Sequence, residues 1–181
     1  MQIIYFPGYS TKNIDEGENI VNILIENNYS VFFNRWRHWN EEIQTSREIE
    51  EDISSILNNF GNETEFGIIG KSIGTIAGVN LANRLIENVK IVKFLILLGI
   101  PVGDSSDKDK EDNKDLLAKF DFPVFVIQNN KDEHGNEEQI KKFLEGVECR
   151  LVIKEADNHR YNYPEDILAI IDSVSLQERD R

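Results

Sequence analysis

The chain has 181 residues, of which 40 % are hydrophobic and 29 % are charged, a composition typical of a folded globular protein and not of a disordered one. Its net charge of −13 disfavours partners that are themselves negatively charged, so we expect no binding to nucleic acid and none to a membrane surface. The single cysteine, Cys149, cannot form an intramolecular disulfide, and the N-terminus lacks the pattern of a secretory signal, so a cytoplasmic protein is expected.

Short β-branched and aromatic runs alternate with segments of helical periodicity along the chain. The predicted strands cover residues 3–6, 31–34, 66–69, 92–99, 123–128 and 149–153. The predicted helices cover residues 14–27, 46–59, 72–87, a short segment around Leu116 and Leu117, 137–145 and a last segment that opens at Pro164. This alternation predicts a single α/β domain over residues 1–181, a three-layer α/β/α sandwich whose doubly wound, mostly parallel sheet has about six strands.

Two local patterns add detail to this outline. Thr45 and Glu48 have the spacing of a capping box, which would open the helix at 46–59. Residues 104–115 carry six acids and three lysines and are expected to form a solvated loop. In a doubly wound sheet, ligands bind beyond the carboxyl ends of the strands, so chemistry is expected in the residues that follow each strand.

The segment GIIGKSIGT (67–75) fits two motifs that use different residues. The tripeptide GKS (70–72) matches the end of a phosphate-binding P-loop, but that motif needs a glycine where Glu65 stands. The pentapeptide GKSIG (70–74) is also the G-x-S-x-G of a nucleophile elbow, in which a serine occupies a tight strand-to-helix turn and flanking glycines avoid collision. The strand before it and the helix after it favour the elbow, with Ser72 as the nucleophile.

An elbow serine needs a histidine as its base, and in this motif the histidine comes last in the chain. The sequence has three histidines. His38 precedes Ser72, and His134 follows the strand at 123–128 and is interpreted as a surface loop residue. His159 follows the last predicted strand, which is where the chain order places the base.

The acid of the triad is expected in a loop between the nucleophile and the histidine. Asp132 lies four residues beyond the strand at 123–128 and is the favoured candidate, with Glu133 beside it as a weaker one, while Asp104, after the strand at 92–99, remains an alternative. A carboxylate in this place would fix the tautomer of His159 and stabilise the imidazolium that forms during the reaction.

Four segments, each placed after a predicted strand, carry a resemblance to the α/β-hydrolase superfamily. They are FPGYS (6–10), GKSIG (70–74), IQNNKD (127–132) and DNH (157–159). The resemblance spans nearly the whole chain and is closest in kind to small serine hydrolases without a cap, because the region where larger members insert a lid is short here. It implies an oxyanion hole formed by the backbone N–H groups of Ile73 and Tyr9.

An aromatic and basic cluster, NRWRHWN (34–40), follows the second predicted strand. Its tryptophans could wall a substrate site while an arginine binds a substrate carboxylate, or they could cover the end of the sheet while the arginines pair with acids. The candidate substrate-binding residues are Trp36, Arg37, His38 and Trp39. Lys71, next to the elbow serine, is expected to be exposed or paired with a carboxylate.

These features predict a serine hydrolase that cleaves a carboxylic ester, a thioester or a related acyl bond of a small molecule. Ser72, Asp132 and His159 would form the triad, and this chemistry requires no metal and no organic cofactor. The alternative is a protein that keeps the fold and binds a ligand without catalysis, because a fold does not by itself determine a function.

Overall fold

The computed structural model describes residues 1–179, with side chains described to residue 176. These residues contain one six-stranded sheet in which all neighbouring strands are parallel. The strands are β1 (Gln2–Phe6), β2 (Ser30–Phe33), β3 (Glu65–Lys71), β4 (Ile91–Leu98), β5 (Val124–Asn129) and β6 (Arg150–Lys154). Their order is β2-β1-β3-β4-β5-β6, so the chain reverses its progress across the sheet between β1 and β3. Ligand crevices of doubly wound sheets form at such a switch point.

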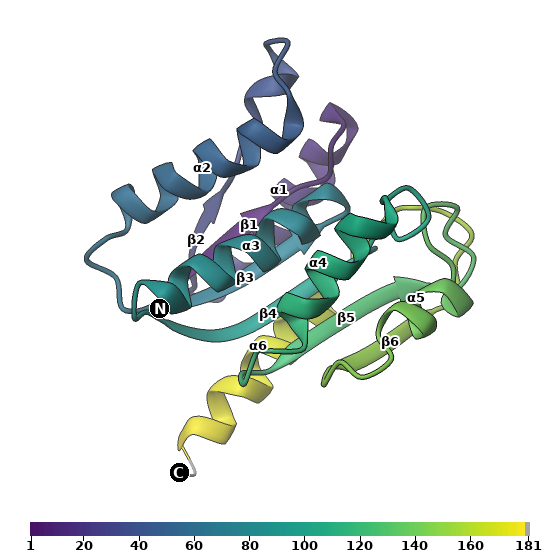
Figure 1. Cartoon of the computed structure of the whole chain (residues 1–181). Helices are drawn as coiled ribbons and strands as arrows, with labels where there is room; N and C mark the ends of the chain where they lie inside the picture. The colour runs from purple at the N-terminus through teal and green to yellow at the C-terminus, as the bar shows by residue number, and fades with distance from the viewer. Residues whose placement is uncertain (180–181) are drawn as a thin grey trace.

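Helices cover both faces of this sheet (Figure 1). They are α1 (Ile14–Glu26), α2 (Thr45–Asn59), α3 (Ile73–Glu87), α4 (Asp107–Leu117), α5 (Glu137–Phe143) and α6 (Pro164–Arg179), with 3-10 turns η1 (Thr11–Asn13) and η2 (Arg37–Trp39). The buried side chains of α1 and α6 belong to one hydrophobic cluster, and those of α2 to α5 belong to a second cluster on the other face. The predicted three-layer α/β/α sandwich is therefore confirmed. None of the helices within residues 1–179 is both long enough and apolar enough to cross a membrane.

The side chains of β1 show why the central strands are continuously apolar in sequence. Ile3 and Tyr5 pack into the cluster with α1 and α6, whereas Ile4 and Phe6 pack into the opposite cluster. All four side chains are at most 1 % exposed. Because successive side chains of a strand point to opposite faces, a strand covered on both faces takes apolar residues at successive positions, as residues 3–6 do.

The predicted elements agree with the structure except in the charged segment at 104–115. The six predicted strands are all present, with ends shifted by one or two residues. The expectation of a solvated loop is wrong, because α4 begins at Asp107 and runs through most of this segment. Ser106 caps the helix by accepting a hydrogen bond from the Asp109 N–H (3.2 Å). Only Leu117 of this helix is buried, so the apolar periodicity that reveals a helix in sequence is nearly absent.

The predicted capping box of α2 is also wrong. The residue before the helix is Gln44, which makes no side-chain hydrogen bond to the first turn. Glu48 is fully buried and accepts hydrogen bonds from the backbone N–H and the ring of His38. The Glu48 carboxylate, which the local spacing predicted to cap the helix, therefore binds His38 instead.

Helices α1 and α3 end in the same hydrogen-bonded arrangement, but with different residues at its left-handed position. The Tyr29 N–H donates to Leu24 O (3.0 Å) after α1, and the Lys90 N–H donates to Leu85 O (2.9 Å) after α3. The residue before each donor has a positive φ, 67° for Asn28 and 57° for Val89. Asparagine tolerates this conformation, whereas the branched Cβ of valine makes it costly.

Val89→Asn is therefore expected to raise the free energy of unfolding by about 1 kcal/mol, and Asn28→Val is expected to lower it by about as much. Val89 is 92 % exposed, so its replacement removes no packing. Denaturant titration and thermal melts of both variants measure the effect, which corresponds to about 2–4 °C in Tm for a chain of this size. Equal stability of Val89→Asn and the unmodified protein would contradict the assignment of strain to Val89.

Candidate active site

Ser72 lies alone between the end of β3 and the start of α3, in a strained backbone conformation. Its φ of 55° and ψ of −122° are those of the first central residue of a type II′ turn. The Ser72 N–H donates to Leu98 O of β4 (2.9 Å), and Ser72 O accepts from the Thr75 N–H (2.8 Å). Hydrogen bonds on both sides therefore hold the residue in a conformation that a serine rarely adopts, which is how strain persists at functional sites.

The glycines on either side of Ser72 are required by close backbone contacts. A Cβ on Gly70 would lie 2.2 Å from Gly74 O, and a Cβ on Gly74 would lie 2.2 Å from Phe6 O. Gly67 has a different role, because a Cβ there would lie 2.2 Å from the ring of Phe94. The glycines of this segment thus serve a tight strand-to-helix turn and the packing beneath it, in agreement with an elbow rather than a phosphate loop.

Asp132 and His159, which follow β5 and β6, form a hydrogen-bonded pair. His159 Nδ1 lies 2.7 Å from Asp132 Oδ2, and the two side chains are 15 % and 0 % exposed. His159 Nε2 is also buried and has no hydrogen-bond partner within the part of the chain that the structure describes. With the Nδ1 proton donated to the carboxylate, Nε2 carries a lone pair that can accept a proton.

The Asp132 carboxylate accepts further hydrogen bonds that keep it ionised. Tyr161 donates its hydroxyl to Oδ2, and the His134 N–H donates to Oδ1 (2.9 Å). Burial alone would raise the pKa of this carboxyl, but the hydrogen bonds that it accepts hold the pKa of Asp132 below its ordinary value. The charge needed to stabilise an imidazolium at His159 is therefore present at neutral pH.

Asp104, the alternative acid, contacts a different histidine. Its Oδ2 lies 2.5 Å from His134 Nδ1. The His134 ring in turn packs edge-on against the ring of His159, with 4.4 Å between their centroids. Of the carboxylates considered for the triad, the one that reaches His159 is that of Asp132, because Asp104 and Glu133 both lie beside His134.

Ser72 and His159 end at the same edge of the sheet, on loops that follow β3 and β6. Among residues 1–179, no hydrogen bond joins the Ser72 hydroxyl to His159 Nε2. The Ser72 side chain is partly exposed, and α3 begins at the next residue. The structure thus pairs Asp132 with His159 and presents Ser72 at the carboxyl edge of the strands.

The two N–H groups implied by the resemblance lie on backbone segments that touch. Ile73 is the first residue of α3, where the N–H groups of a helix point away from its body. Tyr9 belongs to the loop after β1. That loop lies against the elbow, because a Cβ on Gly74 would meet Pro7 O at 2.7 Å as well as Phe6 O.

The aromatic and basic cluster contacts the protein's own backbone and carboxylates. Trp36 is only 1 % exposed and stacks on Phe6 in the core. Arg37 pairs with Glu51 of α2, and Trp39 donates its indole N–H to Tyr9 O (2.7 Å). The structure therefore places Trp36 in the core and not on the wall of a groove.

Lys71 was expected to be exposed or paired with a carboxylate, and this expectation is wrong. It is 3 % exposed, and its ammonium donates to the side-chain oxygen of Asn13 (2.5 Å). Burial lowers the pKa of Lys71, while the negative charges of Glu16 and Asp132 oppose this shift. Lys71 thus ties the elbow to η1, at the end of the loop that follows β1.

Tyr161 is a site residue that the sequence reasoning missed. Besides donating to Asp132, its hydroxyl accepts a hydrogen bond from the Asn129 N–H (3.1 Å), and the side chain is fully buried. Its ring also fills the space over Gly99, where a Cβ would lie 2.2 Å from the ring. A signal was available, because a tyrosine two residues after the candidate base is well placed to support it.

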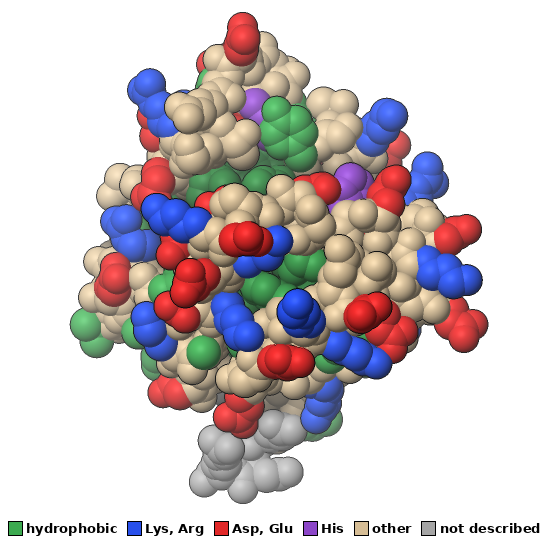
Figure 2. All heavy atoms as spheres, turned by 45° about the vertical axis from the view of Figure 1, so that its right-hand side comes forward, with side chains coloured by type: hydrophobic (Ala, Val, Ile, Leu, Met, Phe, Trp, Pro, Cys, Tyr) green, Lys and Arg blue, Asp and Glu red, His purple; other side chains and the backbone are tan. Residues whose placement is uncertain are grey.

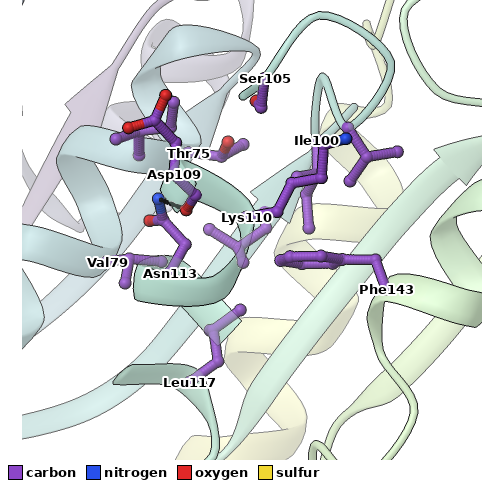
Figure 3. Close-up of a pocket in the computed structure, with 12 residues that line it drawn as sticks. Thr75, Val79, Ile100, Ser105, Asp109, Lys110, Asn113, Leu117 and Phe143 are labelled. Atoms are coloured by element: carbon purple, nitrogen blue, oxygen red, sulfur yellow. Dashed lines mark hydrogen bonds between the residues drawn. The ribbon is translucent and has the colours of Figure 1, made fainter. Parts of the chain in front are cut away.

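A narrow pocket opens between α3 and α4, one turn beyond the elbow (Figure 3). Its lining is mostly apolar, and Val79, Leu117 and Phe143 face the cavity from different sides. Its free volume is ≈ 20 Å³, close to the space that one water molecule needs. The surrounding face, seen in Figure 2, has interspersed acidic and basic side chains with hydrophobic groups in the hollows between them.

Comparisons with known proteins find the same architecture in solved structures of hydrolases. No model of a protein family matches the sequence, and no curated protein sequence matches it. A serine hydrolase without a lid from Xanthomonas campestris superimposes with a TM-score of 0.68 at 16 % identity, covering 97 % of this chain and 81 % of the other. Est1E from Butyrivibrio proteoclasticus, solved with ferulic acid, gives a TM-score of 0.73 at 15 % identity, with 99 % and 90 % covered.

A third solved structure has the same overall arrangement. It is an α/β hydrolase from a metagenome of lagoon sediments at Mar Chica, Morocco, with a TM-score of 0.71 at 14 % identity and 99 % and 92 % of the two chains covered. At such identities the likeness is one of fold. It agrees with the mostly helical covering of one parallel sheet and with the absence of an inserted lid domain between β4 and β5 within the described residues. The chain has the α/β-hydrolase fold in its minimal form without a lid.

Proposed function

We propose that the protein is a serine hydrolase that cleaves a carboxylic ester, a thioester or a related acyl bond through an acyl-enzyme intermediate. The observation that carries this proposal is the buried Asp132–His159 pair, whose free Nε2 lies at the same sheet edge as the strained Ser72. A histidine that donates one nitrogen to a buried carboxylate and leaves the other free is arranged to accept a proton. The hydrolases among the structural neighbours support the same class of reaction.

The first half of the reaction transfers the acyl group to the enzyme. Ser72 Oγ attacks the carbonyl carbon while its proton passes to His159 Nε2, and Asp132 stabilises the imidazolium. The oxyanion of the tetrahedral intermediate is held by the N–H groups of Ile73 and Tyr9. As the intermediate collapses, His159 gives the proton to the leaving oxygen or sulfur. The hydrogen bond between Ser72 and His159 forms when substrate binds, as is common for catalytic hydrogen bonds.

The second half repeats these steps with water in place of the serine. His159 removes a proton from the water, whose oxygen attacks the acyl-enzyme carbonyl. The same oxyanion hole stabilises the second intermediate, and the proton returns to Ser72 as the acid departs. Each of the three side chains is thus restored at the end of the cycle.

The pocket between α3 and α4 is lined mostly by apolar side chains, and Thr75 and Ile76 of its lining belong to the first turn of α3 after Ser72. Short acyl esters and thioesters are therefore the first substrates to test.

The test of this function is labelling with a fluorophosphonate, which reacts with activated serines. The unmodified protein is expected to be labelled at Ser72, as mapped by mass spectrometry of its peptides, and Ser72→Ala is expected to remain unlabelled. Ser105→Ala is a matched control, because Ser105 lies at the same end of the sheet and donates its hydroxyl to Pro101 O. A folded protein that resists labelling would overturn the proposal and favour a ligand-binding protein that has no hydrolase activity.

A further inference from the structure

Three side chains from one segment hold the loop that carries a candidate oxyanion donor. Residues 7–10 are called the oxyanion loop here, and residues 34–40 the clamp segment. Trp36 Nε1 donates to Pro7 O (3.0 Å), and Trp39 Nε1 donates to Tyr9 O (2.7 Å). His38 Nε2 also lies 2.7 Å from Tyr9 O.

The two carbonyls that the clamp segment binds lie on either side of the peptide that carries the Tyr9 N–H. The N–H of Tyr9 belongs to the peptide between Gly8 and Tyr9. Pro7 O belongs to the peptide before it, and Tyr9 O belongs to the peptide after it. Because peptide units are planar and only φ and ψ rotate between them, holding both neighbours leaves the Tyr9 N–H chiefly one way to turn, an opposed rotation of ψ at Gly8 and φ at Tyr9. Holding both neighbours therefore restricts the direction of the Tyr9 N–H.

Glu48 fixes the ring of His38 from the other side. Glu48 Oε2 lies 2.5 Å from His38 Nδ1, and Oε1 accepts the His38 backbone N–H (2.8 Å). The side chains of His38 and Glu48 are 7 % and 0 % exposed. The ring of Tyr9 stacks on that of His38 with 4.2 Å between centroids, which covers the pair from solvent. Burying a carboxylate adds little to the free energy of unfolding, because its desolvation offsets the ion pair that it forms. The contact of Glu48 with His38 is therefore better explained by the fixed orientation that it gives to the His38 ring.

The hydrogen-bond pattern distinguishes His38 from the candidate base. A backbone carbonyl only accepts, so His38 Nε2 must carry the proton that it shares with Tyr9 O. In His159 the carboxylate also holds Nδ1, but Nε2 is left without a partner among the described residues. Both histidines thus pair with a carboxylate through Nδ1. Nε2 of His159 is left to accept a proton, whereas Nε2 of His38 contacts a backbone carbonyl.

We propose that His38, oriented by Glu48 and assisted by Trp39, is a positioning residue that aims the Tyr9 N–H at the oxyanion. This inference rests on the proposed hydrolase function. His38 does not touch the reacting atoms, and it acts through the peptide that it holds. The clamp segment thus contributes to catalysis without contacting the substrate.

Two substitutions of His38 separate this role from a merely structural one. Glutamine places its side-chain N–H₂ about where Nε2 lies, so His38→Gln can still donate to Tyr9 O. Asparagine is shorter and places its amide about where Nδ1 lies, so His38→Asn can still satisfy Glu48 but cannot reach Tyr9 O. If the role of His38 is only to donate a hydrogen bond to the buried carboxylate of Glu48, asparagine is the better replacement. If its role is to hold the loop, glutamine is better.

Kinetics with a p-nitrophenyl ester and with its thionoester, in which C=S replaces C=O, form the first readout. His38→Asn is expected to lower kcat by about 10- to 100-fold with little change in KM, and adding Trp39→Phe is expected to bring the loss to the roughly 10²–10³-fold of a missing oxyanion donor. The preference for the ester over the thionoester should fall in parallel, because sulfur accepts hydrogen bonds poorly. His38→Gln is expected to lose less of both.

NMR relaxation of the Gly8, Tyr9 and Ser10 amides forms the second readout, and it requires no turnover. Increased mobility of these amides in His38→Asn, but not in His38→Gln, would support the proposal that the clamp segment holds the oxyanion loop. If the unmodified protein hydrolyses no substrate, that result would overturn the proposed function but not this contact. Equal mobility in both variants and the unmodified protein would overturn the clamp. An active protein in which both variants lose kcat equally, at an unchanged ester preference, would overturn it as well.

Discussion

Alanine at His159 is expected to lower kcat for a short acyl ester by about 10⁶-fold, the magnitude typical of removing the residue that handles the proton. Without the ring, the proton of Ser72 loses its proposed acceptor, the buried Nε2 that has no hydrogen-bond partner among the described residues. Ser72→Ala is expected to show a loss of the same size. Since the two residues act as one unit, the double variant should be no slower than either single variant.

Steady-state kinetics of the three variants test this expectation, and His134→Ala serves as the control. His134 is a histidine at the same edge whose ring touches that of His159, but its Nδ1 contacts Asp104 and not Asp132. Its loss is expected to be far smaller. Near-normal turnover in His159→Ala would contradict the assignment of the base, and additive losses in the double variant would show that Ser72 and His159 do not share a step.

Asparagine at Asp132 is expected to lower kcat by about 10⁴-fold while leaving the fold intact. The Asp132 side chain is 0 % exposed and accepts hydrogen bonds from His159 and Tyr161 through the same oxygen. An amide in this place can present an N–H₂ to His159 Nδ1, which favours the tautomer that carries its proton on Nε2. That tautomer cannot accept a proton from Ser72. Asp104→Asn is the matched control and should change kcat far less.

The same substitution should alter how stability depends on pH. Hydrogen bonds hold the pKa of Asp132 below its ordinary value despite burial, so the folded state binds this proton less readily than the unfolded state. The stability gained is complete well above the ordinary Asp pKa of about 3.9 and is lost as pH falls through the lower pKa of the folded state. Urea titrations from pH 6 to acid should therefore show the stability gap between the protein and Asp132→Asn closing below about pH 4. A gap that stays constant with pH would contradict a lowered pKa at Asp132.

The outline of the fold could be predicted because each central strand is buried on both faces. The alternation of Ile3 and Tyr5 with Ile4 and Phe6 leaves an unbroken apolar run that sequence periodicity reveals directly. A short helix around Leu116 and Leu117 was predicted, but the charged N-terminal part of α4 was missed for the opposite reason, since only Leu117 of this helix is buried. A helix with one buried side chain gives almost no periodic signal.

The candidate triad could be predicted from its places after strands, because parallel strands bring their carboxyl ends to one edge. The supporting contacts could not. Glu48 has the spacing of a helix cap, and nothing local indicates that its carboxylate instead reaches His38. Lys71 has the appearance of a surface residue in sequence, yet Asn13 meets its ammonium in the interior. Such pairings depend on how distant segments meet, which local patterns do not encode.

The place of β1 in the sheet links the assembly of the site to the order in which the chain is made. Gln2 pairs with Ser30 on one side and with Phe66 on the other, so the second pairing must wait until β3 has been synthesised. Closing so long a segment is entropically slow, and it is the step that brings the loop after β1 against the elbow. Until β3 has paired with β1, the turn at Ser72 and the loop after β1 are not held together, so the proposed oxyanion site cannot exist before the centre of the sheet is assembled.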